Sequence, residues 1–206
     1  MASLHLPSFE EIKDYVVSSN EFRERLAEAA RETKRLDKET SLELQLDLDG
    51  GTQSLSQVYL GTEDLAAAVP RPEGYIALLH LHSHPNQRVI RPSGGDLLFS
   101  ISTNSKNFQR LMEKDEGVAT YPDIGRTINL AKSYSWSTTE AIITVYDNLT
   151  IGMLLYRMIN SLDKSFKEFP KRPSQRDIVN VMRENGHSAV NFLKYKSDKD
   201  GKYTLA

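Results

Sequence analysis

Histidines cluster in one short part of this sequence. His80, His82 and His84 are three of the five histidines, and Asp96 follows at a distance that one loop can span. Side chains at alternating positions of a strand point to one face, so the imidazoles of His82 and His84 are expected side by side. A carboxylate from the next element can join them on one cation, and three protein ligands leave zinc a fourth position for water. The pattern predicts a metal site suited to hydrolysis.

The composition limits the ligands and partners that are possible. The chain has 206 residues, of which 39% are hydrophobic, enough to bury a core of ordinary size. It contains no cysteine, which excludes disulfides, thiolate catalysis and cysteine-based zinc sites. The net charge of −2 gives no overall attraction to nucleic acid or to an anionic membrane. The sequence shows neither a signal-peptide pattern nor an apolar run of about 18 residues, so a cytoplasmic protein is expected.

The residues before the cluster predict two helices followed by two strands. Ser8 and Glu11 match a capping box that opens a short helix ending near residue 17. Residues 21–36 carry apolar side chains at helical spacing. Residues 42–48 alternate leucine with polar side chains, as a half-buried strand does, and residues 55–60 are expected to pair with them after a glycine turn.

The cluster itself is expected at the end of a strand. Residues 75–84 form an apolar run that ends in the histidines, and Pro85 cannot continue a central strand. Ser93 and Asp96 match a second capping pattern, which opens a helix to about residue 112. The remaining expected elements are strands at 118–121 and 141–146, helices at 149–166 and 176–184, and a hairpin near residue 200.

A family resemblance follows from these motifs. His82-Ser83-His84-Pro85, followed by Arg91-Pro92-Ser93-Gly94-Gly95-Asp96-Leu97, resembles the zinc motif of the JAMM (MPN/JAB) metalloproteases. The spacer of residues 85–92 is one residue longer than is usual in the family, and a loop absorbs such an insertion at small entropic cost. The resemblance covers residues 21–146 and implies an α/β fold with a mixed, curved sheet flanked by helices.

The same resemblance suggests how the chain is organised. Residues 1–20 are expected to form an N-terminal helical extension, and residues 21–165 a JAMM/MPN-like metalloprotease domain. Residues 166–206 would then be a C-terminal extension of unknown role, and the polar stretch of residues 164–175, with two prolines, marks the boundary.

The resemblance also implies roles for individual residues. His82, His84 and Asp96 would hold Zn²⁺, with water as the fourth ligand. A glutamate would act as the general base, and Ser93 would donate a hydrogen bond to the developing oxyanion.

Two glutamates are candidates for the general base. The family places this residue at the start of the strand after the first core helix, where Glu39 lies. Glu43 is the alternative, because two strand residues four positions apart share a face. Glu39 is preferred, since Glu43 also fits the polar alternation of a solvated strand face.

Structural roles compete with these functional ones. Ser93 and Asp96 together could be only a helix cap. His80 is expected to be a core residue or a partner of a ligand, and His5 and His187 are expected on the surface.

The expected function is a zinc-dependent metallopeptidase, an isopeptidase similar to a deubiquitinase. Its substrate would be the C-terminal tail of ubiquitin or a ubiquitin-like modifier, with a further partner protein possible and no membrane involved. A non-catalytic MPN-like scaffold protein is one alternative. A nucleic-acid-associated protein similar to the RadC branch is another, although the mildly acidic composition argues against it.

Overall fold

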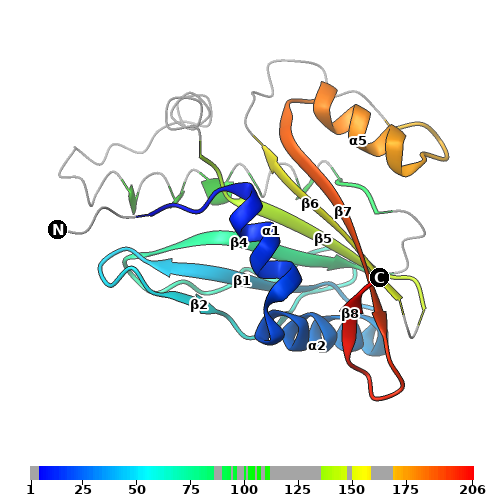
Figure 1. The fold of residues 1–206 in the computed structure, drawn as a ribbon, viewed down its shortest axis with the longest axis horizontal. Coiled ribbons are helices and arrows are strands. Elements are labelled where there is room, and N and C mark those ends of the chain that lie inside the picture. Colours follow the sequence, from blue (N-terminus) through cyan, green and yellow to red (C-terminus); the bar gives the residue numbers. More distant parts are fainter. Residues whose placement is uncertain are drawn as a thin grey trace.

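The strands form one mixed sheet in the order β2-β1-β4-β5-β6-β7-β8, with β3 also paired to β1 (Figure 1). The computed structural model describes residues 5–85, 90–93, 95–96, 100, 102–104, 106–107, 110–111, 136–147, 150–158 and 169–206. The strands are β1 (Thr40–Asp47), β2 (Gln53–Leu55), β3 (Tyr59–Leu60), β4 (Tyr75–His84), β5 (Thr139–Val145), β6 (Thr150–Met158), β7 (His187–Ser197) and β8 (Tyr203–Leu205). The helices with defined bounds are α1 (Phe9–Ser18), α2 (Asn20–Leu36) and α5 (Gln175–Glu184).

The expected α/β fold, a curved mixed sheet flanked by helices, is confirmed. Only β4 and β5 pair in parallel, while every other pairing described in the sheet is antiparallel. Within the described residues, no helix has the length and apolar character needed to cross a bilayer.

The first two helices begin where the capping residues place them. Ser8 and Glu11 form the expected capping box at the start of α1. Ser19 caps α2, which ends at Asp37 in the left-handed conformation. The apolar faces of both helices are buried in the core, with Phe22 and Leu26 of α2 fully enclosed. Burial of these faces fixes α2 along one side of the sheet.

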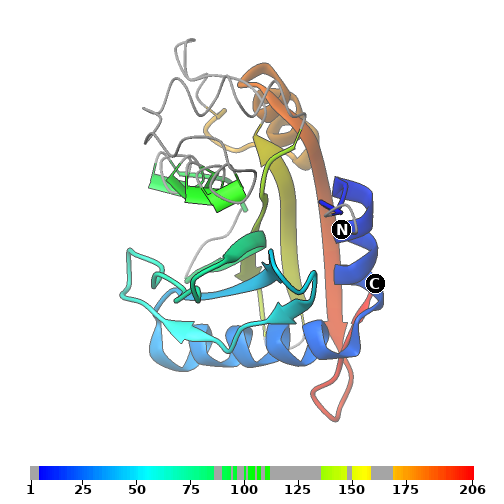
Figure 2. The same ribbon diagram turned by 90° about the vertical axis from the view of Figure 1, so that its left-hand side faces the viewer.

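The two faces of β4 have different surroundings. Leu79, Leu81 and Ser83 face α2, and the Ser83 hydroxyl lies 2.6 Å from that of Thr33 on α2. The histidines alternate with these residues and therefore face the other side. In Figure 2, α2 lies below β1, and helical residues between 95 and 111 lie on the opposite side of the sheet.

Asp96 lies in the connection between β4 and β5. Two parallel neighbouring strands require a crossover that returns the chain to the opposite end of the sheet. The described residues between 95 and 111 are helical, in agreement with a helix that starts after Ser93. Buried Asn107 donates to the Ala77 carbonyl at 2.8 Å and accepts from the Ala77 amide at 3.1 Å. The crossover is thereby fixed to β4.

Two sequence predictions are wrong in this region of the sheet. Residues 149–166 were expected to form a helix, but Thr150–Met158 form β6 between β5 and β7. Both faces of β6 are buried, so its apolar residues show no two-residue period that would distinguish a strand from a helix. Residues 55–60 form parts of two short strands instead of one. The strand expected at 118–121 lies outside the described residues.

The C-terminal residues belong to the same sheet. α5 and the hairpin of β7 and β8 match the helix and turn expected at residues 176–184 and near 200. Gly201 has a φ of 79°, which favours glycine in the turn. β7 pairs with β6 along its length, and α5 covers a second apolar cluster that includes Leu154 and Tyr156. The segment expected as an extension thus supplies two strands and a helix.

We predict that Ser83→Ala destabilises the protein by about 1–3 kcal/mol, because it leaves a buried amide without its acceptor. The Ser83 hydroxyl accepts from the Thr40 amide at 2.8 Å and joins the hydroxyls of Thr33 and Thr40. Urea denaturation measures the loss. Ser18→Ala on the exposed side of α1 is the control, and equal stability of the two variants would contradict the prediction.

Candidate metal centre

The structure brings three of the predicted residues together. Ligand atoms of His82, His84 and Asp96 all lie within 4.8 Å of one another. The Nε2 atoms of the two histidines are 3.1 Å apart. The Asp96 carboxylate lies 3.0 Å from Nε2 of His82 and 3.4 Å from Nε2 of His84. One carboxylate and two imidazole nitrogens thus converge on one point, and this group could hold a metal ion.

The protonation of these residues fits metal binding. Burial lowers the pKa of His82 to about 4, which outweighs the opposing effect of Asp96 and keeps the ring neutral at neutral pH. For Asp96, burial raises the pKa, but hydrogen bonds with His82 and His84 hold it well below its usual range. A neutral imidazole and an ionised carboxylate are the forms that coordinate a cation.

The helix start positions Asp96. The Ser93 amide donates to the Asp96 carboxylate, and the Asp96 amide donates to the Ser93 hydroxyl at 3.2 Å. Ser93 and Asp96 therefore form a helix cap, the structural role considered from sequence. The same carboxylate contacts both histidines, so capping and metal coordination are compatible in this residue. Ser93 is exposed, which leaves its hydroxyl accessible to solvent.

Glu39 lies on the histidine side of the sheet. Ser41 of β1 pairs with His82, and Glu39 directly precedes β1, close enough to His84 and Asp96 to interact with their charges. Burial raises the pKa of Glu39 to about 7, opposed by the charge of His84 and reinforced by that of Asp96. The Ala66 amide also donates to its carboxylate. A carboxyl group with this pKa can both accept and release a proton near neutrality.

Glu43 is not on a solvated strand face, so that expectation is wrong. Its side chain is fully buried and accepts two 2.6 Å hydrogen bonds from Arg71. The Gln45 amide donates to Glu43 at 3.1 Å and to the Pro70 carbonyl at 3.0 Å. The segment that carries Pro70 and Arg71 covers this face of β1. The contact between Glu43 and Arg71 joins residues 28 positions apart, so no local sequence pattern predicts the burial of Glu43.

His80 is a buried neighbour of the metal group. Its Nδ1 lies 3.0 Å from the Glu140 carboxylate, and its ring stacks on that of His82. His80 is thus a core residue beside a candidate ligand, in line with the sequence expectation. His5 is exposed as expected. The expectation for His187 is wrong, because its ring is buried edge-on against Tyr156 where β7 begins.

Sequence reasoning missed three residues that shape the site. Arg71 neutralises Glu43, Asn107 fixes the crossover to β4, and Glu140 pairs with His80. Glu140 is the single charged residue of β5, and this isolated charge was the signal that could have identified it. Arg71 and Asn107 lie in polar segments where nothing in the local pattern distinguishes them.

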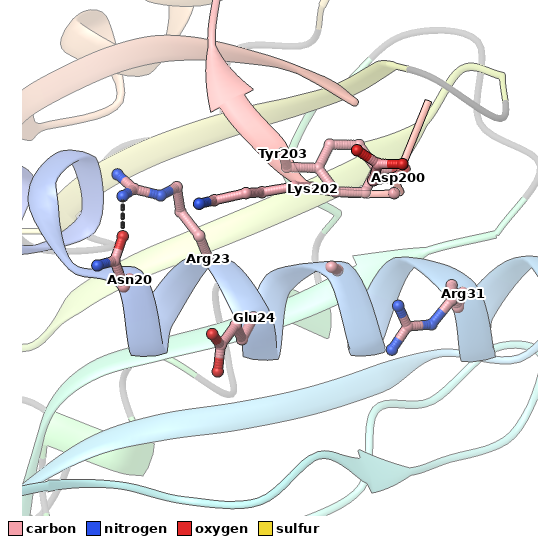
Figure 3. Close-up of a pocket in the computed structure, with 9 residues that line it drawn as sticks. Asn20, Arg23, Glu24, Arg31, Asp200, Lys202 and Tyr203 are labelled. Carbon is pink, nitrogen blue, oxygen red and sulfur yellow. Dashed lines mark hydrogen bonds between the residues drawn. The ribbon is translucent and has the colours of Figure 1, made fainter. Parts of the chain in front are cut away.

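A separate groove of about 380 Å³ lies between α2 and the β7–β8 hairpin (Figure 3). Its lining mixes Arg31 and Lys202 with Glu24 and Asp200. The Arg23 guanidinium at its edge already donates to the Val17 carbonyl at 2.8 Å and to the Asn20 side chain. None of the predicted site residues lines this groove.

We predict that the Glu39 side chain destabilises the metal-free protein progressively as pH rises from about 4.5 to 7. Unfolded Glu39 releases its proton near pH 4.5, whereas the folded protein retains the proton up to about 7. Between these values Glu39 is protonated in the folded state and ionised in the unfolded state, so a rise in pH makes its contribution favour unfolding. Solvent screening reduces the effect, because Glu39 is only partly buried.

Urea denaturation at several pH values, with a chelator present, measures this loss. Relative to wild type, Glu39→Gln should become more stable as pH rises through this range, whereas Glu24→Gln, on an exposed part of α2, should differ from wild type by a constant amount. An identical pH dependence in wild type and Glu39→Gln would contradict the prediction.

Comparison with models of known protein families finds no match to this chain, and comparison with curated proteins finds no similar sequence. The functional assignment therefore depends on the residues of the site and on their geometry.

Proposed function

We propose that this protein is a zinc-dependent metallopeptidase of the JAMM type. The observation that carries the proposal is the convergence of His82, His84 and Asp96 on one point, in the motif order of that family. The absence of cysteine leaves histidine and carboxylate as the available strong ligands, and this ligand set suits zinc. The curved mixed sheet flanked by helices is compatible with a JAMM/MPN-like domain.

Each residue has a distinct task in this proposal. A zinc ion, when bound, would lower the pKa of a water molecule and polarise the scissile carbonyl. Glu39 takes a proton from the attacking water and passes it to the leaving amine as the carbon–nitrogen bond breaks. Ser93 donates a hydrogen bond to the oxygen on which negative charge develops. The raised pKa of Glu39 supports its role in proton transfer. The exposure of Ser93 supports its role as a hydrogen-bond donor to the substrate.

The contacts of Glu43 support Glu39 as the base. The Glu43 carboxylate is held by two nitrogens of the Arg71 guanidinium, which fixes its position and leaves it little room to contact a water molecule at the metal group. Its two oxygens are also occupied by Arg71 and Gln45. Glu39 has no such cation among its hydrogen-bond partners in the described residues.

The proposed substrate is the extended C-terminal tail of ubiquitin or a ubiquitin-like protein. Leu60 and Leu65 are 46% and 67% exposed and lie in the segment that pairs with Glu39 through its backbone. Exposed leucines beside the proposed base suit a tail that presents apolar side chains. Contacts with the folded part of the modifier would help to place the scissile bond.

We predict that the purified protein contains about one zinc per chain, which atomic absorption measures. His84→Ala should lose the metal to a chelator, because two remaining ligands retain zinc poorly. His187→Ala is the control, since it removes a histidine outside the metal group. Full zinc occupancy in His84→Ala would rule out the assigned ligands.

We predict that Glu39→Gln keeps zinc but lowers turnover by about 10²- to 10⁴-fold, because an amide cannot accept the proton of water. The assay is cleavage of a ubiquitin-like fusion protein. Glu43→Gln, the matched variant, should retain more turnover. The reverse order would show that Glu43 is the base.

The same assay tests the class of function. A zinc-loaded protein that cleaves neither the fusion nor its isolated tail peptide would favour the non-catalytic scaffold. Equal kcat/KM for the fusion and the isolated tail would indicate a general peptidase.

A further inference from the structure

The proposed reaction does not use a buried ionisable pair beside the metal group. His80 and Glu140 are direct partners on the parallel strands β4 and β5. Their side chains are 0% and 1% exposed, and Nδ1 of His80 lies 3.0 Å from the Glu140 carboxylate. Such a pair is costly to desolvate, and apolar residues of similar size often stabilise a core at least as well. Packing alone therefore does not account for these two residues.

The pair reaches the metal group through a ring contact. The rings of His80 and His82 are nearly parallel, with an angle of 29° and centroids 5.5 Å apart. The ring of His82 in turn lies 5.0 Å from that of His84. A rotation of the His80 ring would therefore collide with His82 or withdraw its support.

The other nitrogen of His82 shows why this contact matters. A metal-binding histidine commonly donates its second ring N–H to a carboxylate or carbonyl, which fixes the ring orientation. Within the described part of the chain, Nδ1 of His82 is buried without a hydrogen-bond partner. On the Nδ1 side, the orientation of the His82 ring thus depends on packing, and the ring of His80 stacks against its face.

Glu140 is the carboxylate that fixes His80. Glu43 also pairs with His80 across the β1–β4 edge, but Arg71 holds its carboxylate in place. Glu140 contacts Nδ1 of His80 directly, and in a buried setting this hydrogen bond restricts the rotation of the ring.

We propose that His80 and Glu140 are positioning residues for the metal centre. Glu140 holds the His80 ring, and the His80 ring holds His82 at the angle at which Nε2 faces Asp96 and His84. This inference rests on the proposed zinc site and adds the two residues that orient its ligand His82. Neither residue belongs to the converging group of His82, His84 and Asp96.

The test replaces the pair by apolar residues in the full chain, as His80→Leu with Glu140→Leu. Because no charge is left buried alone, the double variant should fold with an unfolding midpoint no lower than that of wild type. Its zinc dissociation constant, measured by competition with a chelator, should rise about 10- to 100-fold. With Co²⁺ as the probe, the visible absorption bands should shift, because the ligand angles change.

Single variants separate positioning from packing. Glu140→Gln keeps an oxygen that accepts from Nδ1 of His80, so its zinc affinity and Co²⁺ spectrum should stay close to wild type. Glu140→Leu removes that acceptor and should weaken zinc binding. His187→Leu removes a buried histidine outside the metal group and should not change zinc affinity.

Wild-type zinc affinity and an unchanged Co²⁺ spectrum in the double variant would overturn the positioning role. If the double variant does not fold, equal zinc affinity of Glu140→Gln and Glu140→Leu would overturn it instead. Zinc lost in His84→Ala but retained in the double variant would leave the proposed function intact. A wild-type protein that binds no zinc would overturn both.

Discussion

The parallel pairing of β4 with β5 is the constraint on which the site depends. Antiparallel neighbours can be joined by a short turn, whereas this pair requires a crossover over one face of the sheet. That crossover passes the end of β4 on the face that carries the buried histidines, and the cap at the start of its helix places Asp96 against His82 and His84. The ligands therefore meet because of the strand topology, and Asn107 keeps the crossover on the sheet.

Alternate side chains of β4 have different roles: those on one face pack in the core, and those on the other face form the candidate metal centre. One face contributes Leu79 and Leu81 to the main core, where α1 and α2 cover it. The other face carries the histidines, and each has a carboxylate within reach: Glu140 for His80 and Asp96 for His82 and His84. Pairing of this kind makes polar burial tolerable, since an isolated buried charge costs several kcal/mol. The apolar face supplies the rigid support that keeps these pairs aligned.

Local patterns predicted the parts of the molecule that local chemistry determines. The strand at residues 75–84, the caps at Ser8 and Ser93 and the approach of Asp96 to the histidines were all visible in the sequence. β6 was not predicted, because a strand buried on both faces has no alternation. The burial of Glu43 depends on Arg71, and the burial of His187 depends on Tyr156. The burial of these side chains depends on contacts between distant segments, and a single sequence gives no information on such contacts.

Hydrogen bonds join the N-terminal residues to segments far along the chain. The Pro7 carbonyl accepts hydrogen bonds from the side chains of Trp136 and Arg157. The Tyr195 hydroxyl donates to the Val16 carbonyl, across 179 positions of sequence. Contacts with such large sequence separations slow folding, because the chain must close long loops before it gains from them. During synthesis the first helices emerge long before β7 and β8, so the part of their apolar surface that packs against Tyr195 and Tyr203 stays exposed until these last strands leave the ribosome.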